Sequence, residues 1–239
     1  MGTDYAEYLI PVRLHASYIP TAETTAALLH GLAKQEWIDP SSQLVRIHTK
    51  PGPSKTLAFP AALKEVSALV ASPAGVKATF PALPSEHWWP KGAVDPSGRS
   101  RMYELEEVDE LLPQYCESVT MVVTAKPAMV PADGRSVRCP RCRELQWGEM
   151  EPHQVGIVLP AVCANCGAPL SPEALLAVTH SPIDGVPTQE PAPYFRFALV
   201  LETASKASPG AFPLRVDPRL MELCFSTTGH QFRSVPQWG

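Results

Sequence analysis

The residues best suited to chemistry in this chain are two pairs of cysteines, each spaced as Cys-x-x-Cys. A tight turn lets the two sulfurs of a pair reach one metal ion, and two such turns complete a tetrahedron with Zn–S distances of roughly 2.3 Å. Four thiolates leave no coordination position open for a substrate. The spacing therefore predicts one structural zinc ion (Zn2+). Its ligands would be Cys139, Cys142, Cys163 and Cys166.

The segment 135–172, with its turn, β-hairpin and second turn, resembles a zinc ribbon. Pro140 pre-sets the first turn, and Gly167 can adopt positive φ after the second. The first turn departs from the usual ribbon pattern, because Arg143 stands where a glycine is usual. The resemblance implies a small lobe that needs its metal to fold. It implies no particular function, because zinc ribbons occur in enzymes, transcription factors, adaptors and immunity proteins.

Disulfide bonds are the alternative use of the six cysteines. They require an oxidising context, and the N-terminus carries no signal segment. No run of about 20 apolar residues is present to span a membrane. We therefore expect a cytoplasmic protein with reduced thiols, in which Cys116 and Cys224 are small buried hydrophobic residues. His153 and His180 could replace a cysteine as ligands, but we expect both on the surface or in a hairpin.

Arginines cluster around the first cysteine pair, and Trp147 follows them. Guanidinium groups beside an aromatic ring could bind phosphate and stack on a base, which makes a nucleic-acid-binding zinc ribbon the alternative function. The same charges could instead offset the formal charge of about −2 on zinc with four thiolates. The net charge of −4 argues against a general nucleic-acid binder. The arginines in question are Arg135, Arg138, Arg141 and Arg143.

Two further segments could contact a protein partner. A predicted helix over residues 103–112 has an acidic face, which would attract a basic partner. A proline-rich loop carries two adjacent tryptophans, and tryptophan is a frequent anchor at interfaces. Each feature also has an ordinary explanation, as a solvated helix face or as a ring folded back onto the core. The candidate partner-binding residues are Glu104, Glu106, Glu107, Asp109, Glu110, Trp88 and Trp89.

The sequence contains no familiar catalytic motif, such as a nucleotide-binding loop, a metal-binding histidine pair or a nucleophile elbow. The segment 226–230 places hydroxyls beside the imidazole of His230, but it lacks a carboxylate, and we interpret it as a turn after a helix. No catalytic residue is assigned. We favour a non-catalytic protein-binding protein, either an adaptor or a toxin-neutralising protein like the bacterial immunity proteins that carry paired Cys-x-x-Cys motifs. An enzyme of unrecognised type is a third hypothesis.

Periodic apolar residues predict the elements that must position these groups. Helices are predicted over 21–38, 60–71 and 217–225, where Thr21 and Asp217 can cap two of them. We expect the first strand at an edge or with a bulge, because Pro11 has no N–H to donate. Alternation of apolar and polar residues predicts strands over 8–14, 44–50, 118–126, 155–162, 194–202 and 230–235.

The order of these elements predicts an α+β fold, with a mixed-sheet body and an inserted four-cysteine zinc-ribbon lobe. Proline-rich joins on both sides of the ribbon resemble the borders of an insertion. The expected division is 1–127 for the first part of the body, 128–175 for the ribbon and 176–239 for the second part. Two separate body domains bridged by the ribbon are the alternative.

Overall fold

A computed structural model of the 239-residue chain describes residues 5–13, 16–49, 52–83, 116–130, 136–172, 175–180, 187–203 and 216–238. Several predicted features lie outside these residues. They are the acidic helix with Glu104, Glu106, Glu107, Asp109 and Glu110, the pair Trp88 and Trp89, and Arg135.

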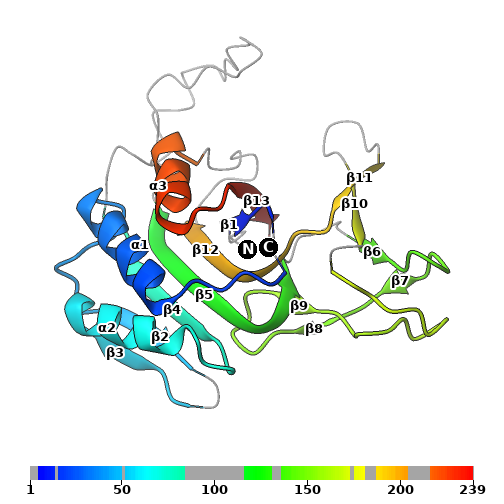
Figure 1. The fold of residues 1–239 in the computed structure, drawn as a ribbon, viewed down its shortest axis with the longest axis horizontal. Helices are drawn as coiled ribbons and strands as arrows, with labels where there is room; N and C mark the ends of the chain where they lie inside the picture. Colours follow the sequence, from blue (N-terminus) through cyan, green and yellow to red (C-terminus); the bar gives the residue numbers. More distant parts are fainter. Residues whose placement is uncertain are drawn as a thin grey trace, which may run out of the picture.

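Among the described residues, the larger of two sheets has nine strands, and its main path joins strands from before and after the cysteine-rich segment (Figure 1). Two short strands, β8 (Glu149–Met150) and β9 (Ile157–Val158), join it where β9 pairs with β5. In spatial order, the main path is β13 (Phe232–Trp238), β1 (Tyr5–Pro11), β12 (Tyr194–Thr203), β5 (Cys116–Met129), β4 (Val76–Pro81), β2 (Val45–His48) and β3 (Lys55–Leu57).

Strands from before and after the cysteine-rich segment therefore share one sheet. Every pairing among the described strands is antiparallel. The α+β class is confirmed, while the sheet in the described residues is antiparallel rather than mixed. Two adjacent parallel strands must be joined by a crossover connection, such as a helix. Here helix α1 (Ala22–Lys34) leads from β1 to β2, which lies several strands away.

Strand β1 lies inside the sheet, between β13 and β12, so the prediction of an edge strand is wrong. Pro11 is the last residue of β1 and pairs with Phe232 of β13. The pairing of β1 with β12 ends at Leu9. The missing N–H of Pro11 therefore interrupts no pairing with β12.

Three helices among the described residues cover one face of the large sheet. They are α1, α2 (Phe59–Leu69) and α3 (Pro218–Thr228), and Thr21 and Asp217 accept the expected capping hydrogen bonds. Their apolar sides pack on alternate residues of the central strands, such as Met121 of β5 and Leu199 of β12. None of the described helices is long and apolar enough to cross a membrane.

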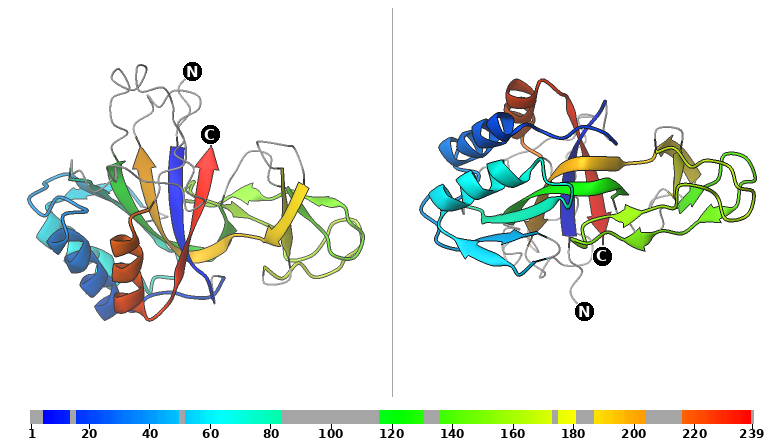
Figure 2. Two further views of the ribbon diagram at one scale, coloured as in Figure 1. Left: turned by 90° about the horizontal axis from the view of Figure 1, so that it is seen from above. Right: turned by 60° about the horizontal axis from the view of Figure 1, so that its bottom comes forward.

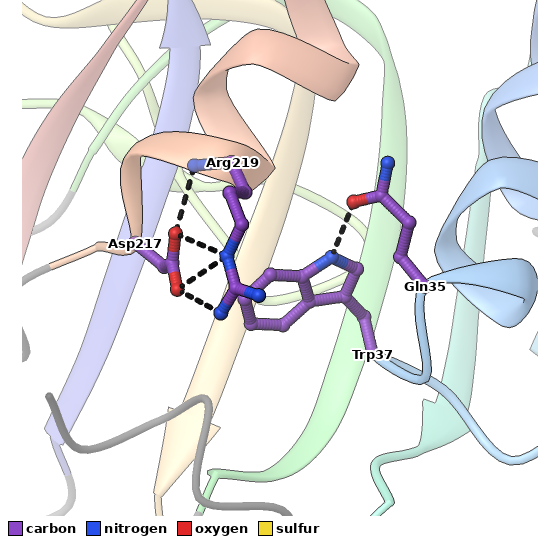
Figure 3. A network of polar contacts seen from close by, with 4 residues as sticks. All are labelled: Gln35, Trp37, Asp217 and Arg219. Atoms are coloured by element: carbon purple, nitrogen blue, oxygen red, sulfur yellow. Dashed lines mark hydrogen bonds and ion pairs between the residues drawn. The ribbon is translucent and has the colours of Figure 1, made fainter.

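Helix α1 ends earlier than predicted, at Lys34, and the following turn is anchored to α3 (Figure 3). The turn buries Trp37, whose indole Nε1 donates to Gln35 Oε1 at 3.1 Å. The Arg219 guanidinium lies 5.9 Å from the Trp37 ring and is held by Asp217 through an ion pair of 2.6 Å. The turn after α1 thus contacts the first residues of α3.

The second face of the large sheet has its own core, closed in part by the loop over residues 151–156. The Tyr8 hydroxyl donates to Val155 O at 2.9 Å, and both side chains belong to this core. Gly156 is required there, because a Cβ at this position would lie 2.7 Å from the Cβ of Ala128. The Glu151 carboxylate accepts the backbone N–H groups of two residues of the loop. The loop thereby fastens the cysteine-rich segment to the sheet.

In the part of the chain that the structure describes, the second sheet has four strands and is formed around the cysteine-rich segment. In spatial order it contains β11 (Pro187–Pro191), β10 (Leu176–His180), β6 (Ser136–Arg138) and β7 (Leu145–Gln146). The helices and this sheet lie at opposite ends of the molecule (Figures 1 and 2). The long strands β5 and β12 pair along their length and lead from one end to the other.

Candidate metal centre

The first cysteine turn, here called the first knuckle (residues 139–144), connects β6 to β7. The two strands pair through Val137 with Gln146 and Arg138 with Leu145. Within the turn, Cys139 N–H donates to Glu144 O at 2.9 Å, and Arg143 N–H donates to Cys139 O at 3.0 Å. Arg143 has a φ of 63°, in the left-handed region that side chains other than glycine rarely adopt. The hairpin therefore presents Cys139 and Cys142 on one side of a closed turn.

The second knuckle (residues 163–168) repeats these hydrogen bonds. Cys163 N–H donates to Ala168 O at 2.8 Å, and Gly167 N–H donates to Cys163 O at 2.8 Å. Gly167 has a φ of 66°, close to that of Arg143 in the first knuckle. Arg143 therefore differs from the glycine of the usual ribbon pattern in its side chain, while the backbones of the two knuckles have the same conformation at this position.

The four sulfurs of these knuckles lie together, as the spacing predicts. Cys139 Sγ lies 3.6 Å from Cys166 Sγ, and Cys142 Sγ lies 3.7 Å from Cys163 Sγ. All four sulfurs lie within 4.8 Å of one another. A tetrahedron of sulfurs about 2.3 Å from a central ion has edges of about 3.8 Å, whereas a disulfide requires about 2.0 Å. The cluster has the dimensions of a four-coordinate metal site, and all four thiols are free.

Backbone hydrogen bonds prepare two of the thiols for metal binding. The N–H of Cys142 lowers the pKa of Cys139, and the N–H of Cys166 lowers the pKa of Cys163 to about 6. The pKa of Cys166 is raised to about 11: the N–H of Ala168 favours its thiolate, but desolvation and the three neighbouring sulfurs outweigh it. A bound cation would relieve this repulsion, because it favours the thiolate form of every ligand.

The cluster is packed onto the ends of the two long strands. Cys139 and Cys163 are buried, and Cys142 and Cys166 are half-buried. The same apolar cluster contains Met129 at the end of β5 and Tyr194 at the start of β12, together with Ala16, Val137, Ala168, Leu170, Leu175 and Ala192. A metal held here would therefore join the cysteine-rich segment, here called the metal lobe (residues 136–172), to the centre of the large sheet.

Besides backbone N–H groups, a side chain donates a hydrogen bond to a ligand sulfur. Arg141 N–H donates to Cys139 Sγ at 3.4 Å, as expected for a Cys-x-x-Cys turn. The side-chain amide of Gln146 donates to Cys163 Sγ at 3.5 Å. Sequence reasoning missed Gln146, because its approach to Cys163 depends on how the first hairpin lies against the second knuckle.

The arginines of the first knuckle are exposed, and Trp147 beyond them is 79% exposed. Arg138 Nη1 donates to Arg143 O at 3.1 Å and so braces the turn. Arg141 and Arg143 complete the described part of the predicted arginine cluster. The geometry is compatible with both hypotheses for these residues, a binding surface or a counter-charge for the metal.

Among the described residues, the group that could hold a metal consists of the four cysteines, without a histidine. His153 lies in the loop of the β8–β9 hairpin, one of the two positions expected for it, and its side chain is buried there. His180 ends β10, where it pairs with Pro187 in the β10–β11 hairpin. The Thr228 hydroxyl donates to the carbonyl of Cys224 in α3, and the His230 ring contacts the Tyr18 ring in a tilted arrangement, with 4.3 Å between their centroids. Segment 226–230 is therefore the end of a helix and the turn after it.

No protein-family model, curated protein or solved structure matches this chain at a significant level.

Proposed function

We propose that this chain is a non-catalytic protein-binding protein, an adaptor or a toxin-neutralising protein, whose four clustered cysteines hold one structural zinc ion. The observation that carries the proposal is the set of four sulfurs at tetrahedral spacing, packed against the ends of β5 and β12. Four sulfur ligands fill the coordination sphere of zinc, so the ion acts as a cross-link. The free thiols also favour a reducing compartment such as the bacterial cytoplasm.

The donor set and the two matched knuckles support zinc among the common metals. Four thiolates in a tetrahedron are typical of zinc and of iron–sulfur centres. The knuckles, each with a hairpin or bridge at its base, follow the zinc-ribbon pattern. When bound, zinc would supply the folding free energy that a lobe of this size lacks, while Cys139, Cys142, Cys163 and Cys166 would hold it.

Apolar side chains on the metal lobe support a binding function. Trp147, Met150 and Val162 are 79%, 55% and 52% exposed. Tryptophan is enriched among the residues that dominate interface energies, and here it follows a strand that is fixed to the second knuckle. We therefore propose that a partner protein buries Trp147. The acidic stretch with Glu106, Glu107 and Glu110 favours a partner with a basic surface.

The test is capture of partners by the tagged protein, compared among three forms. The wild type should retain a stoichiometric protein partner and one zinc ion per chain, and Trp147→Ala should lose the partner while keeping the zinc. Phe225→Ala is the matched control, because Phe225 is a half-exposed aromatic residue on α3, at the other end of the molecule. Equal capture by Trp147→Ala and the wild type would remove the metal lobe from the binding proposal.

Nucleic-acid binding by the metal lobe is a second candidate, favoured by the exposed arginines beside Trp147. If it operates, nuclease treatment should release bound material, and affinity should fall steeply with salt concentration. Arg138→Ala with Arg141→Ala should weaken binding and reduce the salt dependence. Arg219→Ala is the control, since Arg219 lies on α3 beside Trp37.

A further inference from the structure

Gln146 is a buried polar residue at the boundary between the two knuckles. It lies on β7 opposite Val137 and is 8% exposed. Its side-chain Nε2 donates to Glu144 O at 2.7 Å and to Cys163 Sγ at 3.5 Å. The amide has two N–H groups, and these two contacts use both.

The two contacts link opposite halves of the metal centre. Glu144 belongs to the first knuckle, and Cys163 is a ligand from the second. The Arg141 N–H, by contrast, donates to a sulfur of its own knuckle. Gln146 is thus a side chain that ties one hairpin to a ligand on the other.

A hydrogen bond to a thiolate at a buried site affects both position and charge. It fixes the ligand in the orientation that the metal needs, as partners outside the ligand set do in other metal sites. It also draws charge from a sulfur that lies 3.7 Å from the next one. Because Gln146 is buried, water cannot readily replace it as a donor.

We propose that Gln146 is a positioning residue of the metal centre, which holds Cys163 at metal-binding spacing and offsets the charge of its thiolate. This inference rests on the proposed zinc function. It assigns to a residue outside the four ligands a measurable share of the affinity for the metal.

Two substitutions separate hydrogen bonding from packing. Gln146→Met keeps the length of the side chain and removes the donor. Gln146→Glu keeps the shape but places a carboxylate against a carbonyl and a thiolate. Competition with a chromophoric chelator should show zinc affinity reduced about 10- to 100-fold in Gln146→Met. We expect a greater loss in Gln146→Glu, and Trp147→Ala, the exposed neighbour, should retain the wild-type affinity.

Cobalt(II) in place of zinc supplies a readout that a purely structural role would not change. Without its N–H donor, Cys163 becomes the more easily oxidised sulfur, so the thiolate-to-cobalt charge-transfer band of Gln146→Met should move to lower energy. The band is measured on metal-loaded protein, so it reports on the sulfur even if the metal-free variant is unfolded.

An unchanged band together with zinc affinity within about twofold of wild type would overturn the role of Gln146. A wild-type protein that binds neither zinc nor cobalt would overturn the proposed metal function as well. The first result leaves the zinc proposal standing, so the two failures are distinguishable.

Discussion

Arg143 and Gly167 occupy equivalent positions in the two knuckles, with φ of 63° and 66°. A Cβ at Gly167 would meet no atom within 4 Å, so substitution there meets only the backbone strain. Left-handed backbone costs a residue other than glycine roughly 1–2 kcal/mol. The first knuckle bears this strain, and the second avoids it.

We predict that Arg143→Gly raises the free energy of unfolding by about 0.5–1 kcal/mol, since the strain relieved exceeds the added chain entropy of glycine. Gly167→Ala should lower it by about 1 kcal/mol for the converse reason. Urea unfolding of the metal-loaded protein measures both. Arg141→Gly is the control in the same knuckle. It should not stabilise, because Arg141 is not among the described residues with positive φ.

The six cysteines should react in two groups. Cys116 and Cys224 are buried, and burial raises the pKa of Cys224 to about 12 and also raises that of Cys116. At pH 8 both stay protonated and shielded, and only a thiolate is nucleophilic enough to attack a thiol reagent. With a chelator present, four thiols should react in the folded protein, and the last two only in denaturant. Fast reaction of a fifth thiol in the folded state would contradict this assignment.

The metal ligands could be predicted from the sequence, because Cys-x-x-Cys pairs impose their geometry locally. The left-handed conformation of Arg143 could not, since arginine carries no preference for it. The contact of Gln146 with a ligand sulfur could not be predicted from the sequence either. Its partner Cys163 is distant in sequence, and only the packing of one hairpin on the other brings them together.

At the scale of elements, the apolar cluster around the sulfurs includes residues of the large sheet. Met129 and Tyr194 pack with Cys139 and Cys163 and are also the first paired residues of β5 and β12 at that end. The metal lobe therefore shares its core with the strands that hold the body together.

Removal of the metal with a chelator should loosen these strand ends as well as the lobe. Hydrogen exchange measured by mass spectrometry should show faster exchange over 136–172 and at the adjoining ends of β5 and β12. Strands β2 and β4 pair at the far side of β5 and serve as the internal control. Faster exchange confined to 136–172 would show that the lobe unfolds independently.

The predicted helices 21–38, 60–71 and 217–225 were found near their expected starts, because caps and prolines mark those starts, whereas the helix over 103–112 stays a prediction. The end of α1 was not predicted, because Glu36 takes a left-handed φ of 63° that its sequence does not signal. The metal lobe contains strands of only two residues, such as β7 and β8, which are too short for a periodic pattern. Strand β4 was missed although Val76, Ala78 and Phe80 alternate with Lys77 and Thr79, because its six residues give only a short pattern.

At the scale of the whole molecule, the metal lobe shares an apolar cluster with the ends of β5 and β12, so metal binding should stabilise the entire chain. Zinc at about 100 times its dissociation constant should add about 2.7 kcal/mol to the free energy of unfolding. For a chain of this size, that corresponds to a rise of about 5–10 °C in the melting temperature.

Differential scanning calorimetry should show one transition that moves with zinc, while magnesium, which prefers oxygen ligands, leaves it unchanged. Two unfolding transitions, of which only one moves with zinc, would contradict the inference that the metal lobe and the large sheet share a core. The division into 1–127, 128–175 and 176–239 stays a prediction that this measurement addresses.

Strand β1 has consequences for the order in which the protein can fold. Both of its neighbours, β12 and β13, follow all the other described strands in the sequence. During synthesis, Leu9 and Ile10 therefore leave the ribosome long before any strand exists to cover them. Strand β1 can be paired only after residues 194–238 have been synthesised, so its apolar residues need protection from aggregation until then.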